Sequence, residues 1–163
     1  MRAILLAGAA ILAIAATPAF ADPLQMGGVN VTQGGGNINA AIGRNSMADQ
    51  SVTTLGGTSL GGHGRTKTMG GQNGNFAVGT NSFASQDVTT VGGAAGRHGS
   101  SFTSGGANLN AAIGRNSEAD QSVTTMGGFA GRGGHTAVSG GQNANLALGK
   151  NSLASQQVLT IGQ

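Results

Sequence analysis

Along most of this chain, recurring and variable side chains alternate with a period of two, and the pattern returns four times. Each copy reads Asn-x-Ala-x-Gly-x-Asn-Ser-x-Ala-x-Gln-x-Val-x-Thr-x-Gly. The copies begin at Asn39, Asn75, Asn110 and Asn145, which are separated by 36, 35 and 35 residues. Period two is the period of a β-strand, whose successive side chains point to opposite faces. The apolar spacing of three and four that a helix requires is absent from these copies.

The parity of the recurring positions changes once in every copy. In the first copy the first series is Asn37, Asn39, Ala41, Gly43 and Asn45. The second series is Ser46, Ala48, Gln50, Val52, Thr54 and Gly56. Two adjacent recurring residues, Asn then Ser, suit a corner where the chain bends and the same face stays inside. Each copy therefore predicts a strand, an Asn-Ser corner and a second strand.

A short polar-apolar segment and a group of glycines precede each copy. We expect these segments, residues 29–33, 66–69, 101–104 and 136–139, to form a weaker third strand, with Gly-rich turns such as 61–64 and 131–134 between rungs. A repeat of this length is typical of stacked architectures. The predicted fold class is all-β, a β-solenoid or stacked β-arch with four rungs of about 35 residues. The predicted solenoid covers residues 35–163, with units near 35–57, 70–93, 105–128 and 140–163. The preceding segment, residues 22–34, is either the first strand or a free tail.

The recurring face is expected to lie inside and to be held by side-chain amides. Buried amides are costly unless they are hydrogen-bonded. In a stack, each amide can bond to the same residue one rung away, as in cross-β ladders. The candidate ladder residues are Asn39, Asn75, Asn110, Asn145, Asn45, Asn81, Asn116, Asn151, Gln50, Gln86, Gln121 and Gln156.

Two apolar columns are expected on the outer face. One contains Ile42, Val78, Ile113 and Leu148, and the other contains Leu55, Val91, Met126 and Ile161. A third strand or a partner chain would have to cover them, because an uncovered apolar stripe favours association. Stacking in order would also place the neutral Ser85 between Asp49 and Asp120, which avoids directly stacked like charges.

The first residues indicate export. Arg2 precedes a short apolar run, and Ala19-Phe20-Ala21 is a small-residue cleavage signal, so residues 1–21 are predicted to be a signal peptide and the mature chain to begin at Asp22. The apolar run is too short to span a membrane, and no membrane span is expected in the mature chain. The expected location is extracellular or at the cell surface, by way of the periplasm if the source is Gram-negative.

The composition restricts what can stabilise the fold. The 163 residues include 32 Gly and 5 Phe, no Trp, Tyr or Cys, and only 8% charged residues. Large apolar side chains are scarce and disulfides are excluded, so stability must come from backbone ladders, close packing of small residues or association. A disordered Gly-rich chain is the alternative, and the strict alternation opposes it. A net charge of +3 with no charge run does not resemble a nucleic-acid footprint.

Catalytic and metal chemistry have little support. His63, His98 and His135 fall one in each inter-unit turn at differing offsets, and solvated turn residues are favoured over a metal or acid-sensing ladder. No nucleophile elbow, zincin or phosphate-loop motif occurs. The chain is therefore not expected to be an enzyme, and no cofactor is expected.

The Asn, Ala, Ser and Gln face, the Gly-rich turns, the strand-corner-strand unit and the leader together resemble curli (curlin-type) subunits. The nearest stretch is Asn45-Ser46-Met47-Ala48-Asp49-Gln50 and its copies. The resemblance implies a secreted protein that polymerises into extracellular amyloid fibres with adhesion or biofilm roles. The implied partners are other copies of the chain and a nucleator or outer-membrane secretion factor.

A second resemblance ranks below it. The stretch Ala41-Ile42-Gly43-Arg44-Asn45-Ser46-Met47-Ala48 resembles the head repeat of trimeric autotransporter adhesins. Such adhesins carry a stalk and a membrane anchor, and neither is expected beyond the last unit here. A soluble β-solenoid that binds a surface or polysaccharide stays open as the alternative function, motivated by the regular pairs Thr53-Thr54, Thr89-Thr90 and Thr124-Thr125.

Overall fold

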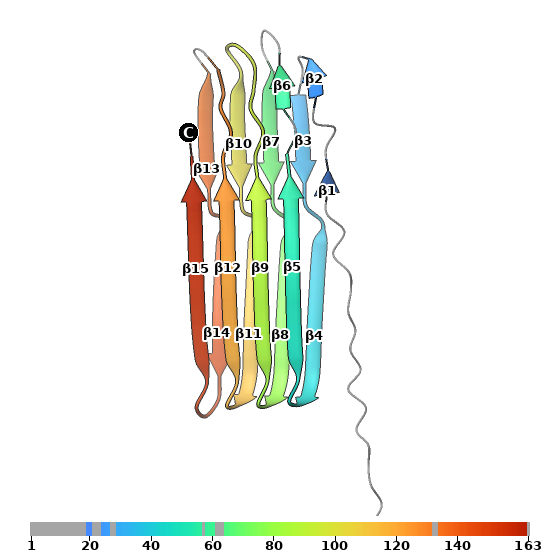
Figure 1. Ribbon diagram of the computed structural model, residues 1–163, viewed down its shortest axis with the longest axis vertical. Coiled ribbons are helices and arrows are strands. Elements are labelled where there is room, and N and C mark those ends of the chain that lie inside the picture. Colours follow the sequence, from blue (N-terminus) through green and yellow to red (C-terminus); the bar gives the residue numbers. More distant parts are fainter. Residues whose placement is uncertain are drawn as a thin grey trace, which may run out of the picture.

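The protein is an all-β solenoid in which each sequence copy contributes one rung of a stack (Figure 1). The computed structural model describes residues 19–20, 24–26, 29–56, 58–60, 64–131 and 134–162. Every strand pairing in these residues is parallel, because the chain returns to the same side of the stack after each circuit. The predicted fold class is confirmed.

Each rung contains three strands. The first rung is β3 (Val29–Gln33), β4 (Gly36–Arg44) and β5 (Met47–Leu55), and the second is β7 (Arg65–Met69), β8 (Gln72–Thr80) and β9 (Phe83–Val91). The third rung is β10 (Ser100–Ser104), β11 (Ala107–Arg115) and β12 (Glu118–Met126), and the fourth is β13 (His135–Ser139), β14 (Gln142–Leu148) and β15 (Leu153–Ile161). The predicted third strand is therefore present in every rung, and 29–33 completes the first one. It starts one residue earlier than expected in the other three.

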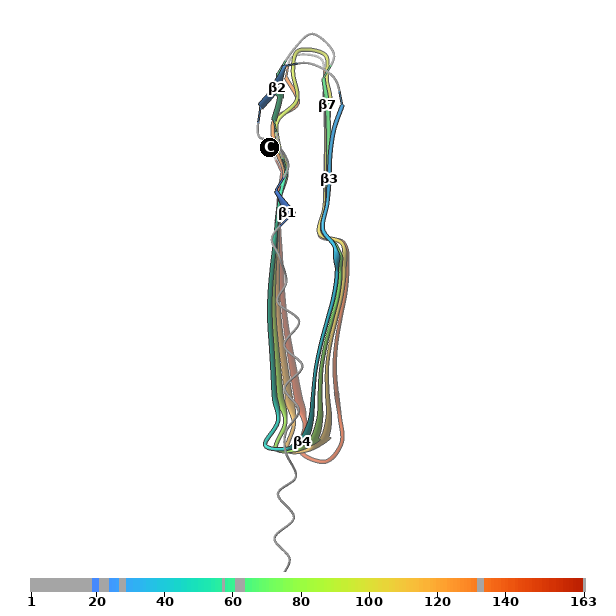
Figure 2. The ribbon, with the colours of Figure 1, turned by 90° about the vertical axis from the view of Figure 1, so that its right-hand side faces the viewer.

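Three sheets arise from this stacking. The Asn sheet has the order β14-β11-β8-β4, the Gln sheet β1-β5-β9-β12-β15, and the short sheet β13-β10-β7-β3. Figure 2 shows two layers, with the Gln sheet on one side and the Asn sheet followed by the short sheet on the other. The Gln sheet thus lies opposite the Asn sheet, and the short sheet faces mainly the residues that follow the Gln-sheet strands, such as Gly93.

The rungs stack in sequence order without slippage. Asn39 pairs with Asn75, and Gln50 pairs with Gln86, so identical positions of successive copies are neighbours. Ser85 pairs with Asp49 on one side and Asp120 on the other, which confirms the expected neutral rung between the two carboxylates. This register keeps every recurring position on one face along the whole stack.

The Asn-Ser corner has a left-handed backbone in every rung. Asn45, Asn81, Asn116 and Asn151 have φ between 49° and 56°, and asparagine tolerates this region better than most residues. The glycine two residues earlier is also required, because a Cβ added at Gly79 would lie 1.6 Å from the carbonyl oxygen of Gly43. The recurring Gly-x-Asn-Ser sequence is thus explained by the backbone at the bend.

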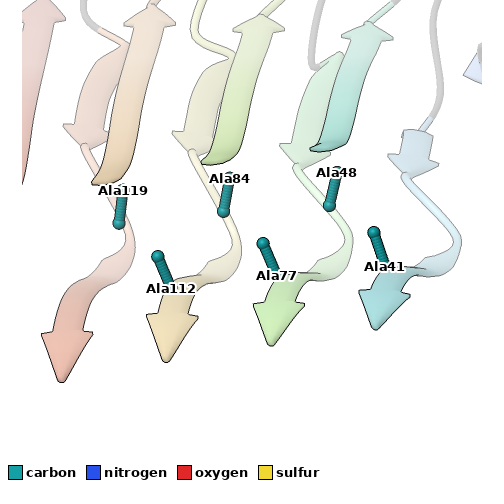
Figure 3. Packing of buried hydrophobic residues seen from close by; sticks show 6 residues of the cluster. All are labelled: Ala41, Ala48, Ala77, Ala84, Ala112 and Ala119. Carbon is teal, nitrogen blue, oxygen red and sulfur yellow. The ribbon is translucent and has the colours of Figure 1, made fainter. Parts of the chain in front are cut away.

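The core is made of small and polar side chains. Ala41, Ala77 and Ala112 of the Asn sheet point toward Ala48, Ala84 and Ala119 of the Gln sheet (Figure 3). A second cluster contains Val52, Val88 and Val123. These alanines let the two layers approach closely, which compensates for the scarcity of large apolar residues.

The first rung carries additional short strands at its outer edge. β1 (Ala19–Phe20) pairs with Thr54 and Leu55 of β5, and β2 (Leu24–Met26) pairs with β6 (Thr58–Leu60). The predicted signal peptide otherwise lies outside the described residues, as do positions 61–63 and 132–133 of the predicted turns.

Candidate functional site: the amide ladders and the end rungs

A continuous ladder of glutamine amides runs along the interior of the Gln sheet. Gln86 Nε2 donates to Gln50 Oε1, Gln121 Nε2 to Gln86 Oε1, and Gln156 Nε2 to Gln121 Oε1, each at 2.6 Å. All three bonds point toward the first rung, so the ladder has a direction. At its first end, Gln50 Nε2 is buried and has no hydrogen-bond partner.

The asparagine ladder in the Asn sheet runs in the opposite direction. Asn75 Nδ2 donates to Asn110 Oδ1 at 3.0 Å, and Asn110 Nδ2 donates to Asn145 Oδ1 at 3.1 Å. The first rung departs from the pattern, since Asn39 Nδ2 donates to the carbonyl oxygen of Asp49 at 2.8 Å but not to Asn75. As a result Asn75 Oδ1 is buried without a partner. The predicted ladder is confirmed between the second, third and fourth rungs but not between Asn39 and Asn75.

The same asparagines also link the two layers, which the sequence did not indicate. Asn75 Nδ2 lies 2.7 Å from the carbonyl oxygen of Ser85 and 3.0 Å from that of Ala48. Asn110 makes the equivalent contacts to Asp120 at 2.7 Å and Ala84 at 3.0 Å. Each buried asparagine therefore holds its own rung closed and contacts the preceding rung as well. The period of two along a strand identifies which side chains point inward. It does not identify which backbone carbonyls of the opposite layer they meet, because that depends on where the chain bends at the corner.

A further asparagine ladder was not among the predicted site residues. Asn37 Nδ2 donates to Asn73 Oδ1 at 3.0 Å, Asn73 to Asn108 at 2.7 Å, and Asn108 to Asn143 at 2.7 Å. The sequence could have identified this ladder, because the position is Asn in all four copies. Its bonds point toward the fourth rung, like those of the other Asn-sheet ladder.

The corner asparagines form a ladder, but it is exposed. Asn81 donates to Asn45 at 3.2 Å, Asn116 to Asn81 at 3.1 Å, and Asn151 to Asn116 at 3.3 Å. The expectation that the whole recurring face lies inside is wrong here, because the left-handed backbone turns these side chains outward at the bend. Water competes for exposed amides, so this ladder contributes less than the buried ones.

The two ends of the stack differ in what they expose. At the first end, β3 and β4 are edge strands, and the edge of β5 is paired with β1 only at Thr54 and Leu55. At the other end β13, β14 and β15 are the last strands of their sheets within the described residues. All nine residues of β15 are exposed, whereas the matching residues of β12 alternate between buried and less buried. The fourth rung is thus an open β-edge.

The predicted outer columns lie where expected. Ile42, Val78, Ile113 and Leu148 stack on the outer face of the Asn sheet, and Leu55, Val91, Met126 and Ile161 stack on the Gln sheet. The third strand covers neither column, since it lies in line with the Asn sheet and faces the end of the Gln sheet. Gly56 and Gly92 mark this contact, because a Cβ there would overlap the side chains of Thr68 and Thr103.

The histidines do not form a column in the described residues. His135 begins β13 and pairs with Ser100, which pairs in turn with Arg65. His98 lies in the preceding turn with φ of 59°, and His63 lies outside the described residues. In the part of the chain that the structure describes, no group of three or more His, Cys, Asp or Glu side chains could hold a metal ion.

Comparison with known protein families, with curated proteins and with solved structures finds no match to this chain. The described residues contain no helix that is long and apolar enough to cross a membrane.

Proposed function

We propose that this protein is a secreted structural subunit that assembles end to end into extracellular, curli-like amyloid fibres supporting adhesion or a biofilm matrix. The observation that carries this proposal is the complementarity of the two end rungs. Both ends present strands of the same sheets, in the same order and the same parallel direction, so a second copy can continue the stack without a change of register.

The ladder directions match across such a junction. Gln50 Nε2 is an unused donor at the first end, and the fourth rung ends in the acceptor Gln156 Oε1. In the Asn sheet the direction reverses, so a continued ladder would run from Asn145 Nδ2, which also donates to the carbonyl oxygens of Ala119 and Ser155, to Asn39 Oδ1 of the next copy. A head-to-tail contact therefore supplies a partner for Gln50, and leaving a buried donor unpaired costs about 1–3 kcal/mol.

Removal of the predicted signal peptide would expose the edge of β5 at the first end of the stack. β1 occupies the edge of β5 at Thr54 and Leu55, where Thr160 and Ile161 of an incoming copy would lie. Cleavage after Ala21, as the sequence predicts, would remove both residues of β1. The mature chain would then present an unpaired β5 edge, which favours addition of the next copy.

A soluble binding module is the second candidate function. It is favoured by the outward column of Thr53, Thr89 and Thr124, whose members lie in direct register on the Gln sheet. Leu159 replaces threonine at the fourth rung and interrupts this column. A chain that stays monomeric at high concentration would favour this function over fibre formation.

The test is growth of the mature chain, 22–163, on preformed fibres of the same chain. We expect Gln156→Leu to slow elongation strongly, because Gln50 of the next copy loses its acceptor. The matched control is Gln157→Leu, which changes the adjacent, outward-facing residue and should elongate nearly as fast as the unaltered chain. Equal elongation rates for the two variants would contradict a ladder that continues across the junction.

A further inference from the structure

The outer face of the Asn sheet is apolar and uncharged over most of its width. Its columns contain Ile38, Gly74, Leu109 and Ala144; then Ala40, Phe76, Ala111 and Leu146; then the Ile42 column. Ile38 is 61% exposed and Ile42 is 71% exposed. Exposed apolar area of this extent on a regular sheet indicates an interaction surface.

The charges of the described rungs are segregated between the two faces. Asp49, Asp87, Glu118 and Asp120 all lie on strands of the Gln sheet, and none lies on the Asn sheet. The Asn sheet has charges only at its corner end, at Arg44 and Arg115, with Lys150 in the turn that follows β14. The apolar columns carry no charge of their own, so an uncharged surface can cover them.

Large and small side chains alternate along these columns with a period of two rungs. Ala40, Phe76, Ala111 and Leu146 alternate small and large, and Ile38, Gly74, Leu109 and Ala144 alternate in the opposite sense. The alternation would persist across a head-to-tail junction, because Leu146 would be followed by Ala40. A hollow of about 630 Å³ lies over this part of the sheet, lined by residues that include Ile38, Gly74, Phe76 and Leu109.

We propose that this face, defined by the columns of Ile38, Ala40 and Ile42, binds the same face of a second copy, so that two solenoids pair laterally in the fibre. The inference rests on the proposed end-to-end assembly. The two copies are related by a two-fold rotation about the fibre axis combined with a shift of one rung along it, which keeps their growth directions the same. The column of Ala40 then faces itself, and the column of Ile38 faces that of Ile42.

This arrangement fits the shape and the charge of the face. With this shift of one rung, Phe76 and Leu146 lie opposite Ala40 or Ala111, and Ile42 and Ile113 lie opposite Gly74 or Ala144. Val78 and Leu148 lie opposite Ile38 or Leu109, so large side chains meet at these positions. The rotation also places the Arg44 column of one copy opposite the neutral column of Gly36, Gln72, Ala107 and Gln142 of the other. The two rows of cations are thus kept at opposite margins of the interface, where they do not repel one another.

The size of the face explains why pairing should require assembly first. Seven residues at about 3.3 Å and four rungs at about 4.8 Å give roughly 440 Å² per copy. A stable interface needs about 800 Å² per partner, so single copies should not dimerise through this face. In a fibre the face is continuous and the contact area grows with length.

The test is the mass per unit length of fibres of 22–163, measured by scanning transmission electron microscopy. The expected value is two chains per about 19 Å of fibre, since four rungs at about 4.8 Å make one chain. We expect Ile38→Lys/Ile42→Lys to form fibres with half this value, because unpaired cations are not tolerated in an apolar interface. The matched control, Met47→Lys/Ser51→Lys, places the same charges at the same spacing in the same rung but on the Gln sheet, and should keep two chains.

Each other outcome overturns the inference. Unaltered fibres with one chain per about 19 Å would show that no lateral pairing occurs, and single fibres that bind phosphatidylcholine vesicles through this face would assign it to a lipid surface. A variant Ile38→Lys/Ile42→Lys that still gives two chains would place the contact elsewhere. Absence of any fibre would instead contradict the proposed assembly, and the lateral pairing with it.

Discussion

The side-chain amide of Gln86 donates a hydrogen bond of 2.6 Å to Oε1 of Gln50, the equivalent residue of the preceding rung. Gln86 is only 1% exposed, and its own Oε1 accepts an equally short bond from Gln121. Each internal glutamine is therefore both donor and acceptor in a buried chain of amides. Such a chain is stabilising when every member is paired and costly when one is missing.

We predict that Gln86→Leu destabilises the solenoid by about 2–6 kcal/mol. The substitution leaves two buried groups without partners, Gln50 Oε1 and Gln121 Nε2, at about 1–3 kcal/mol each. Gln86→Leu/Gln121→Leu should also slow polymerisation. The measurements are denaturant unfolding where the chain is soluble and thioflavin kinetics where it assembles.

Two comparisons make this prediction specific to the ladder. Ser122→Leu, next to Gln121 but on the outer face of β12, should leave stability and assembly nearly unchanged. Replacing all four ladder glutamines by leucine should cost less per site than Gln86→Leu, since no amide is then left unpaired. Unaltered kinetics in Gln86→Leu/Gln121→Leu would count against the ladder as the basis of stacking.

We predict that Gly79→Ala strongly destabilises the second rung. Gly79 has φ of 146°, and a Cβ there would overlap the carbonyl of Gly43. Backbone strain alone costs about 1–3 kcal/mol, and the overlap adds to it. The control is Gly35→Ala, where an added Cβ meets no atom within 4 Å. Comparable unfolding free energies for the two variants would show that the close approach of Gly79 and Gly43 is not required.

We predict that the corner at Asn116 depends on backbone conformation more than on its amide. Asn116 has φ of 49° and is exposed. Asn116→Gly should change stability by less than about 1 kcal/mol, because glycine adopts this conformation freely. Asn116→Ala should cost about 1–2 kcal/mol, the usual penalty for a left-handed residue with a Cβ. Equal losses in both variants would instead assign the effect to the exposed asparagine ladder.

The rung, its corner and its stacking order could be predicted from the sequence because each depends on a local rule. Period-two alternation identifies the strands, and the adjacent pair Asn45 and Ser46 identifies the bend. Identical amides at one position per copy then predict ladders, since stacking brings Gln50 onto Gln86. No long-range information beyond the repeat is needed for these conclusions.

The remaining features depend on the three-dimensional geometry of the rung. The bond from Asn75 to the carbonyl of Ser85 requires knowing which residues face each other across the two layers. The outward position of Asn45 follows from its left-handed backbone, which the alternation does not reveal. The break between Asn39 and Asn75 falls at the first rung, where Asn39 makes the bond within its own rung but has no preceding rung to supply the second carbonyl contact that Asn75 makes to Ala48.

End-to-end assembly is tested most directly by fibre diffraction from the mature chain, 22–163, diluted from denaturant and followed by thioflavin fluorescence. The account predicts fibres with reflections near roughly 4.7 Å along the fibre axis and about 10 Å across it. A chain that remains a soluble monomer at high concentration, with the circular dichroism of a folded β-protein, would contradict it.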